Sequence, residues 1–242
     1  IEAGRRALAD AGGSPSAVGL VIVESTTHQD RAPYTAGRVA AALGMTNGPA
    51  PIDINTACSG FEYALGLADQ SIRTGSADVA LVIGSEVLSG IADWTDRSTC
   101  VLVGDGAGAA VLGVAETPEI GPVSWGSVPH LLDAVRVEGS PGRFNQEGRS
   151  IYRWAITEAE GHARKVVEAA GLSMDDIEVF AFHQANLRII EPLVTALGGE
   201  SKFVIRDVVE SGNTSAASVP LGLSKAWERG DLPEGVPALL FG

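Results

Sequence analysis

Short apolar runs alternate with amphipathic stretches along most of the chain, a pattern that predicts alternating strands and helices. Residues 18–23 and 79–83 are rich in β-branched side chains, which is typical of buried parallel strands, and residues 50–55 form a third candidate strand. Apolar side chains recur at helical spacing over 2–11, 35–43 and 59–74, and a Gly-rich segment over 101–114 has strand character at both ends. The alternation predicts an α/β layered fold.

A weak internal repeat divides the chain in two. Residues 163–173 parallel residues 4–14, and at the same offset the strand 20–23 falls on 179–182. Further along, the helix 59–74 matches residues 217–229, and residues 83–84 fall on 241–242. Two unrelated α/β units would look alike at this level. The order of the matches favours two duplicated α/β halves, at residues 1–116 and 117–242.

The same repeat predicts that both ends of the protein lie outside this sequence. The second half carries residues 117–161 ahead of its first matched helix, whereas the first half has almost nothing before Glu2. The first half continues from Gly84 to Val114, whereas the second half stops at Gly242. We therefore expect a protein of roughly 320 residues.

Composition and charge narrow the possible partners. The 242 residues are 45% hydrophobic and 19% charged, which suits a packed globular protein. The formal charge of −13 argues against nucleic acid and against anionic membranes as partners. Cys58 and Cys100 cannot form a disulfide framework, and no Cys/His spacing resembles a metal site. We therefore expect a cytoplasmic, metal-free protein.

Cys58 is the strongest candidate nucleophile. It lies in Asn55-Thr-Ala-Cys-Ser-Gly60, at the turn between a predicted strand and a predicted helix. Backbone N–H groups at a helix start favour a thiolate, so the position predicts a lowered thiol pKa. The alternative is a small buried apolar residue. The small neighbours of Cys58 favour the nucleophile, because they let a substrate approach closely.

Two further polar residues follow predicted strands. His183 comes directly after the strand 179–182, and Asn213 lies in Gly212-Asn-Thr-Ser-Ala216. Open α/β sheets bind their ligands at the carboxyl ends of strands. A structural histidine and an ordinary turn asparagine are the alternatives. A cysteine with a distant His and Asn fits covalent acyl chemistry.

These segments resemble β-ketoacyl-(acyl-carrier-protein) synthase III, a condensing enzyme of the thiolase superfamily. The matching motifs occur in family order across almost the whole chain and are Thr56-Ala-Cys-Ser-Gly-Phe61, Asp96-Arg97, Gly104-Asp-Gly-Ala-Gly-Ala109, His183-Gln-Ala-Asn186 and Gly212-Asn-Thr-Ser-Ala216. The resemblance implies a thiolase-like fold of αβαβα layers, a homodimer, and an acyltransferase with the catalytic triad Cys58, His183 and Asn213.

The resemblance also implies a reaction. Cys58 would take an acyl group from acyl-CoA as a thioester, and malonyl-acyl carrier protein would lose CO₂ to give the enolate that attacks it. Donors from His183 and Asn213 would stabilise the negative charge that develops on the malonyl thioester oxygen. This step initiates fatty acid biosynthesis or polyketide synthesis, with a CoA thioester and phosphopantetheine-bound malonyl as substrates and no cofactor.

Two alternatives use the same fold. A starter-unit acyltransferase of polyketide metabolism would use the same triad with a different acceptor. A non-catalytic subunit that only pairs with a partner would be expected to lose its nucleophile. The presence of Cys58, His183 and Asn213 argues against the non-catalytic subunit.

Six further residues receive substrate-binding roles by resemblance. Arg97 would contact the CoA nucleotide, Arg153 and Arg188 would meet phosphates or the carrier protein, and Asn186 would support the hydrogen-bond network of the site. A solvated surface charge is the alternative for each arginine.

Val103 and Ala32 occupy positions where bulkier side chains are frequent in the family. Both changes predict a larger acyl site, and therefore primers that are longer or more branched than acetyl.

Overall fold

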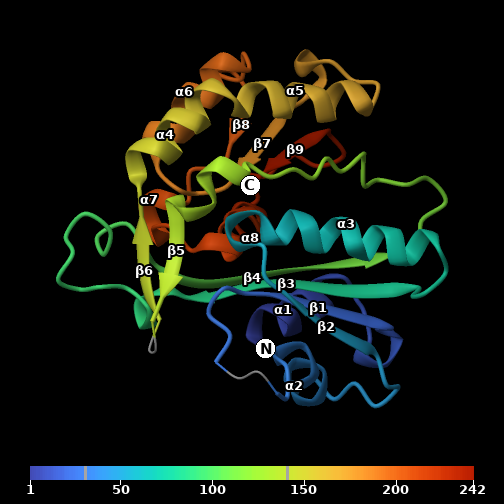
Figure 1. Cartoon of the computed structure of the whole chain (residues 1–242). Helices are drawn as coiled ribbons and strands as arrows, with labels where there is room; N and C mark the ends of the chain where they lie inside the picture. The colour runs from blue at the N-terminus through green and yellow to red at the C-terminus, as the bar shows by residue number, and fades with distance from the viewer. Residues whose placement is uncertain (30–31, 140–141) are drawn as a thin grey trace.

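Two sheets alternate with three layers of helices in the computed structural model, which describes residues 1–29, 32–139 and 142–242 (Figure 1). One outer layer holds α1 (Glu2–Asp10) and α2 (Thr35–Ala42), and the middle layer holds α3 (Gly60–Arg73) and α8 (Ser218–Glu228). The other outer layer holds α4 (Gly148–Thr157), α5 (Ala159–Ala169) and α6 (Leu187–Ala196). The predicted αβαβα layering is confirmed.

Both sheets place their first strand in the centre. The first has the order β2-β1-β3-β4, from β1 (Leu20–Glu24), β2 (Ala50–Ile54), β3 (Val79–Val87) and β4 (Asp105–Gly113). Only β4 is antiparallel to its neighbour. The second has the order β8-β7-β9, all parallel, from β7 (Val179–Phe182), β8 (Phe203–Val204) and β9 (Ala238–Phe241). The division between residues 116 and 117 stays a prediction.

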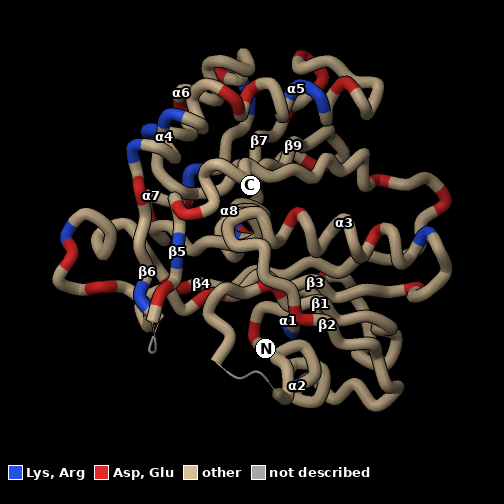
Figure 2. The backbone as a smooth tube through the Cα atoms, viewed as in Figure 1, with Lys and Arg blue, Asp and Glu red and all other residues tan. Residues whose placement is uncertain are grey.

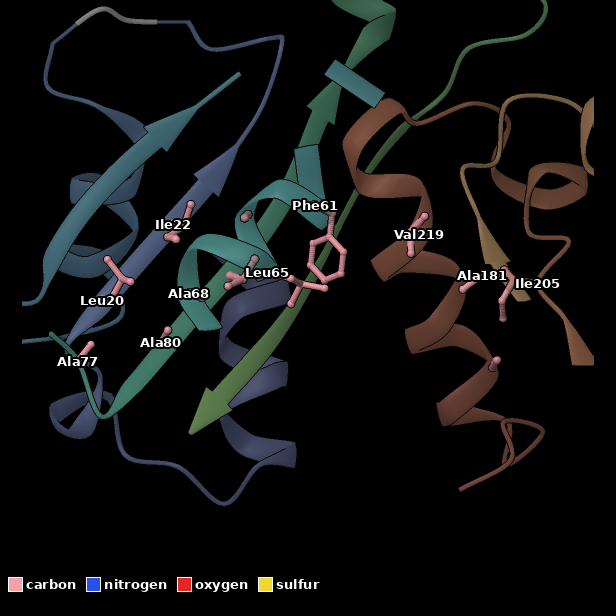
Figure 3. Close-up of a cluster of buried hydrophobic side chains, with 13 residues drawn as sticks. Leu20, Ile22, Phe61, Leu65, Ala68, Ala77, Ala80, Ala181, Ile205 and Val219 are labelled. Carbon is pink, nitrogen blue, oxygen red and sulfur yellow. The ribbon is translucent and has the colours of Figure 1, made fainter. Parts of the chain in front are cut away.

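The middle helices join the two sheets into one apolar core. Figure 3 shows Ile22 of β1 and Phe61 of α3 in the same buried cluster as Ala181 of β7 and Val219 of α8. Glycine allows the layers to approach this closely: a Cβ on Gly84 would lie 2.4 Å from the carbonyl oxygen of Ala216. Burial of apolar surface on both sides of α3 and α8 therefore fixes one half against the other.

The predicted elements agree with the structure except around residue 101. Only the second half of the Gly-rich segment is a strand, β4, whereas Val101 and Leu102 lie in turns. The backbone of Asn213 bonds to this segment. Its N–H donates to the Leu102 carbonyl oxygen, and its carbonyl oxygen accepts from the Gly104 N–H, both at 2.8 Å. The strand expected at residue 101 is wrong because these backbone groups bond to a loop of the second half.

Residues 117–161, for which the sequence predicted no elements, contain a hairpin and a helix. The hairpin joins β5 (Val135–Glu138) to β6 (Arg143–Gln146), and α4 follows it directly. A short helix, α7 (Val208–Ser211), lies just ahead of Asn213.

Candidate active site

Cys58 lies in a tight turn between β2 and α3. A short 3-10 turn over Ala57–Ser59 connects them, and Ala57 has a left-handed φ of 53°. The Asn55 side-chain oxygen accepts from the Ala57 N–H at 3.3 Å, and Glu24 Oε1 accepts from the Thr56 N–H at 3.1 Å. Left-handed backbone is uncommon for residues other than glycine, so these two hydrogen bonds hold a conformation that the chain would otherwise avoid.

A second turn of the same construction carries Asn213. Ser215 has a left-handed φ of 48°, and the Asn213 side-chain oxygen accepts from the Ser215 N–H at 2.8 Å. The following residues, Ser215–Ala217, form a 3-10 turn that leads into α8. Asn213 is also paired with Val103 in an isolated parallel bridge. The two Asn-Thr turns therefore share one local geometry, in which Cys58 follows the left-handed residue of the first turn and Asn213 is the asparagine that accepts the hydrogen bond in the second.

Cys58, His183 and Asn213 face one cavity of about 620 Å³. The walls come from the β5–β6 hairpin, α4 and α6, and much of their surface is apolar, with Val135, Phe144, Ile151, Trp154, Ile189 and Leu193 among the lining residues. The three residues that sequence motifs selected thus line one cavity, whose apolar walls suit an acyl chain.

The Cys58 thiol is protonated at rest. Burial raises the pKa of Cys58 to about 11, and the Glu86 carboxylate raises it further. The Ser215 hydroxyl, whose Oγ lies 3.9 Å from Cys58 Sγ, lowers this pKa but does not offset the burial. The expectation of a lowered thiol pKa at the helix start is wrong. The charged groups that act on the thiol are carboxyls rather than cations, and desolvation outweighs the helix end.

His183 is held with a defined ring orientation. Its Nδ1 lies 2.8 Å from Ser218 Oγ, and its backbone N–H donates to the Phe241 carbonyl oxygen at 2.7 Å. Burial lowers the pKa of His183 to about 4, while the Glu62 carboxylate acts in the opposite direction. The imidazole is therefore neutral at pH 7. A Ser218 hydroxyl that donates to Nδ1 leaves the ring proton on Nε2.

Two buried glutamates behind Cys58 were missed by sequence reasoning. Glu24 and Glu86 are almost fully buried. Glu86 accepts from the Thr26 N–H at 3.0 Å and from the Thr27 hydroxyl at 2.7 Å. A Cβ on Gly60 would lie 1.9 Å from Glu24 Cδ, so Gly60 is required where this carboxyl packs under the turn.

Burial, followed by the charge of Glu86, raises the pKa of Glu24 to about 8. Glu24 is then protonated in the folded protein at pH 7 but ionised in the unfolded chain, whose ordinary pKa is 4.5. Because the folded state binds the extra proton, the free energy of unfolding falls as pH rises from about 4.5 to about 8 and then levels off, by at most about 1.4 kcal/mol per pH unit from this group.

Glu24→Gln should remove the fall in the free energy of unfolding that Glu24 causes between about pH 4.5 and 8. We expect the variant to unfold like the wild type at pH 5 and to gain stability over it as pH rises to 8, by roughly 2–4 kcal/mol. Urea unfolding between pH 5 and 8 measures the difference. Glu168→Gln, on the exposed surface of α5, is the control and should follow the wild type. Parallel curves for Glu24→Gln and the wild type would contradict a protonated Glu24.

The other residues selected by resemblance lie outside the cavity wall. Arg153 is exposed on α4, whose Trp154 lines the cavity, and Arg188 is exposed on α6, whose Ile189 lines it. Asn186 is the N-cap of α6, where its side-chain oxygen accepts from the Arg188 N–H at 2.9 Å.

The three remaining predicted residues belong to the first half of the chain and also lie outside the cavity wall. Arg97 and Ala32 are exposed in loops, and Val103 touches the site only through its backbone pairing with Asn213. Arg136 of β5 lines the cavity and was not predicted, because residues 117–161 showed no recognisable pattern.

Within residues 1–29, 32–139 and 142–242, no group of three or more His, Cys, Asp and Glu side chains is placed to hold a metal ion. In the same ranges no helix has both the length and the apolar character to span a bilayer.

Comparison with known proteins identifies the family. The family described as 3-oxoacyl-[acyl-carrier-protein (ACP)] synthase III matches residues 52–129, and the C-terminal part of the same family matches residues 167–242. Beta-ketoacyl-[acyl-carrier-protein] synthase III 4 of Streptomyces coelicolor is 56% identical over 99% of this chain and 77% of its own length. The synthase III of Streptomyces glaucescens is 43% identical over 100% of this chain and 76% of its own length.

Solved structures similar to this chain point to the same family. The priming beta-ketosynthase of a polyketide biosynthetic pathway has a TM-score of 0.93 at 37% identity, over 98% of this chain and 74% of its own. The 3-oxoacyl-(acyl carrier protein) synthase III of Pseudomonas aeruginosa has a TM-score of 0.90 at 34% identity, over 98% and 76%. The thiolase-like fold expected from the motifs is confirmed. This chain belongs to the 3-oxoacyl-[acyl-carrier-protein] synthase III family of condensing acyltransferases.

Proposed function

We propose that this chain catalyses the decarboxylative condensation of an acyl-CoA primer with malonyl-acyl carrier protein, through an acyl thioester on Cys58. The observation that carries the proposal is the meeting of Cys58, His183 and Asn213 at one largely apolar cavity in a chain of this family. The product, a β-ketoacyl carrier, would start fatty acid or polyketide synthesis. The reaction needs only its CoA and carrier-bound thioesters, without a cofactor.

Acyl transfer to Cys58 is the first half-reaction. The sulfur attacks the acyl carbonyl carbon, the C–S bond to CoA breaks, and CoA leaves as a thiol. In the proposed pose, the backbone N–H of Cys58 stabilises the tetrahedral oxyanion. The apolar walls contributed by α4, α6 and the hairpin then hold the acyl chain.

Decarboxylation of the malonyl group is the second half-reaction. Loss of CO₂ places negative charge on the malonyl thioester oxygen, where His183 Nε2–H and the Asn213 amide would donate. A neutral, desolvated His183 suits this role because its low pKa keeps it a neutral donor throughout. The enolate carbon then attacks the acyl-Cys58 carbonyl, and the Cys58 thiolate leaves and takes up a proton.

A basic surface beside the cavity suits an acidic carrier and the phosphates of CoA. In Figure 2, basic positions on α4, at the start of α6 and on the β5–β6 hairpin lie on one side of the chain, with some acidic positions among them, although the whole chain has a net charge of −13. Arg136 lines the cavity itself, and exposed Arg149, Arg153 and Arg188 lie on its two flanking helices. Local positive charge on an acidic protein favours encounter with anionic partners.

An unpaired sheet edge supports a homodimer. Among the described residues, β2 pairs on one side only, with β1, and its Ile52 side chain is 41% exposed. An edge strand with an exposed apolar residue is a template for pairing with a second copy. We place the dimer in the cytoplasm, where Cys58 and Cys100 stay reduced.

The likeness to a priming ketosynthase of polyketide biosynthesis favours one second candidate. In that case the same acyl-Cys58 would form, but the acyl group would pass to a different acceptor. The two functions share the loading step and differ in malonyl decarboxylation.

A primer panel tests the proposal. The purified protein is incubated with acetyl-, isobutyryl- or octanoyl-CoA, and the acyl adduct is followed by intact mass before malonyl-acyl carrier protein is added. We expect the isobutyryl and octanoyl adducts to form at least as fast as the acetyl adduct, because the cavity is large and apolar, and a β-ketoacyl carrier to follow. Strict acetyl preference would contradict the acceptance of larger primers, and adducts without CO₂ release would favour the second candidate.

A further inference from the structure

Glu62 occupies an unusual position at the start of α3. It lies four residues after Cys58, and within the described structure neither of its carboxyl oxygens reaches solvent or has a hydrogen-bond partner on another residue. A buried carboxyl without partners is costly, so its presence beside a reaction centre calls for a role.

The carboxyl of Glu62 lies beside Gly242, the residue that follows β9. A Cβ on Gly242 would be 2.9 Å from Glu62 Oε2 and 3.0 Å from the Cys58 carbonyl oxygen, and Gly242 lines the cavity. The backbone N–H of His183 donates to the carbonyl oxygen of Phe241, the residue before Gly242, at 2.7 Å. Glu62 therefore sits beside the end of β9, close to both reacting groups.

The titratable groups around Glu62 come from four other places in the fold. His183 follows β7, Cys58 lies in the turn before α3, and Glu24 lies at the end of β1 with Glu86 of β3 beside it. Burial raises the pKa of Glu62 to about 7, whereas its own backbone N–H and then His183 lower this pKa, and Cys58 raises it slightly further. The charge of Glu62 and the charge of His183 are thus coupled.

The first half-reaction needs a group that accepts the Cys58 proton, and Glu62 and His183 together can supply one. The Cys58 proton must leave as the C–S bond forms, yet the thiol has a pKa of about 11 and the neighbouring imidazole one of about 4. His183 alone is a poor acceptor. An ionised carboxylate nearby favours the protonated imidazole, as an opposite charge does in other buried pairs.

We propose, on the basis of the condensing function above, that Glu62 is a positioning residue that acts through His183, stabilising the imidazolium that forms during acyl transfer. In the tautomer that carries out this step, Nδ1–H donates to Ser218 Oγ and Nε2 is unprotonated, so the Cys58 proton moves to Nε2 as sulfur attacks the acyl carbon. The bond from that carbon to the CoA sulfur breaks, and the CoA thiolate takes the proton from Nε2. The second half-reaction uses the other neutral tautomer, in which the Ser218 hydroxyl donates to Nδ1 and Nε2–H is the donor, and has no need of the Glu62 charge.

Glu62→Gln separates the two half-reactions. We expect acylation of Cys58 by isobutyryl-CoA at pH 7.5 to slow about 10- to 100-fold, the effect of losing an opposite charge worth 1–2 pKa units. The wild-type acylation rate should rise through an inflection near pH 7, where Glu62 ionises, and the variant should lack that inflection. Malonyl decarboxylation by the same sample should stay within about threefold of the wild type, which also reports that the variant is folded.

Two further variants sharpen the test. Glu62→Asp keeps the charge and should retain the inflection, whereas exposed Glu168→Gln should match the wild type in every measurement. Equal acylation profiles for Glu62→Gln and the wild type, or equal losses in both half-reactions, would overturn the proposal. A wild-type protein that is not acylated at all would instead overturn the proposed function.

Discussion

Cys58→Ala should form no acyl adduct with any acyl-CoA, and its condensation activity should fall to background. Covalent transfer needs a nucleophile in the wall of the cavity, and a methyl group cannot accept an acyl chain. Alanine removes only the sulfur atom, and the Cys58 turn is held by Asn55 and Glu24 rather than by the thiol. Intact mass after incubation with isobutyryl-CoA, together with a thermal unfolding curve, distinguishes lost chemistry from lost folding.

Cys100→Ala is the matched control. It removes the other free cysteine of the chain, which does not line the cavity, so the adduct should form as in the wild type. An adduct that survives in Cys58→Ala and disappears in Cys100→Ala would reverse the assignment of the nucleophile.

Asn213→Asp should load normally and condense poorly. The substitution keeps the side-chain oxygen that accepts from the Ser215 N–H, so the turn is retained, but it removes the amide donor and adds a negative charge where the enolate forms. Loss of one preorganised donor of this kind typically costs about 10²–10³ in rate, or about 2.7–4 kcal/mol. We expect a fall of at least this size in CO₂ release from malonyl-acyl carrier protein, with acylation of Cys58 close to that of the wild type.

Asn145→Asp provides the same chemical change at a site without a role. Asn145 is exposed on β6 and does not line the cavity, whereas its neighbours Phe144 and Gln146 do. Comparable CO₂ release from Asn213→Asp and Asn145→Asp would remove Asn213 from the proposed decarboxylation machinery.

The sequence was sufficient to predict the layers of the fold and the three residues that meet in the cavity. Apolar runs marked β1, β3 and β7 because parallel strands buried on both faces leave a continuous signal. The small residues around Cys58 and the polar residues after strands marked the site for a related reason. Tight turns and strand ends restrict which residue types can occupy them.

The groups that set the charge of the site could not be predicted in the same way. Glu24 and Glu62 look like solvent-facing residues in a sequence, because burial of a carboxyl depends on contacts between segments far apart in the chain. The cavity wall in the β5–β6 hairpin was missed because its alternating residues are short and mixed in character. The sign of the Cys58 pKa shift was missed because a helix end can be recognised locally, whereas desolvation cannot.

The protonated state of the idle Cys58 thiol bears on how long the enzyme survives in the cell. Peroxides and other oxidants react with thiolates far faster than with thiols. A thiol with a pKa of about 11 presents almost no thiolate at pH 7, so the nucleophile resists conversion to sulfenic acid between turnovers. The same burial that slows proton removal should therefore also slow oxidation of this cysteine.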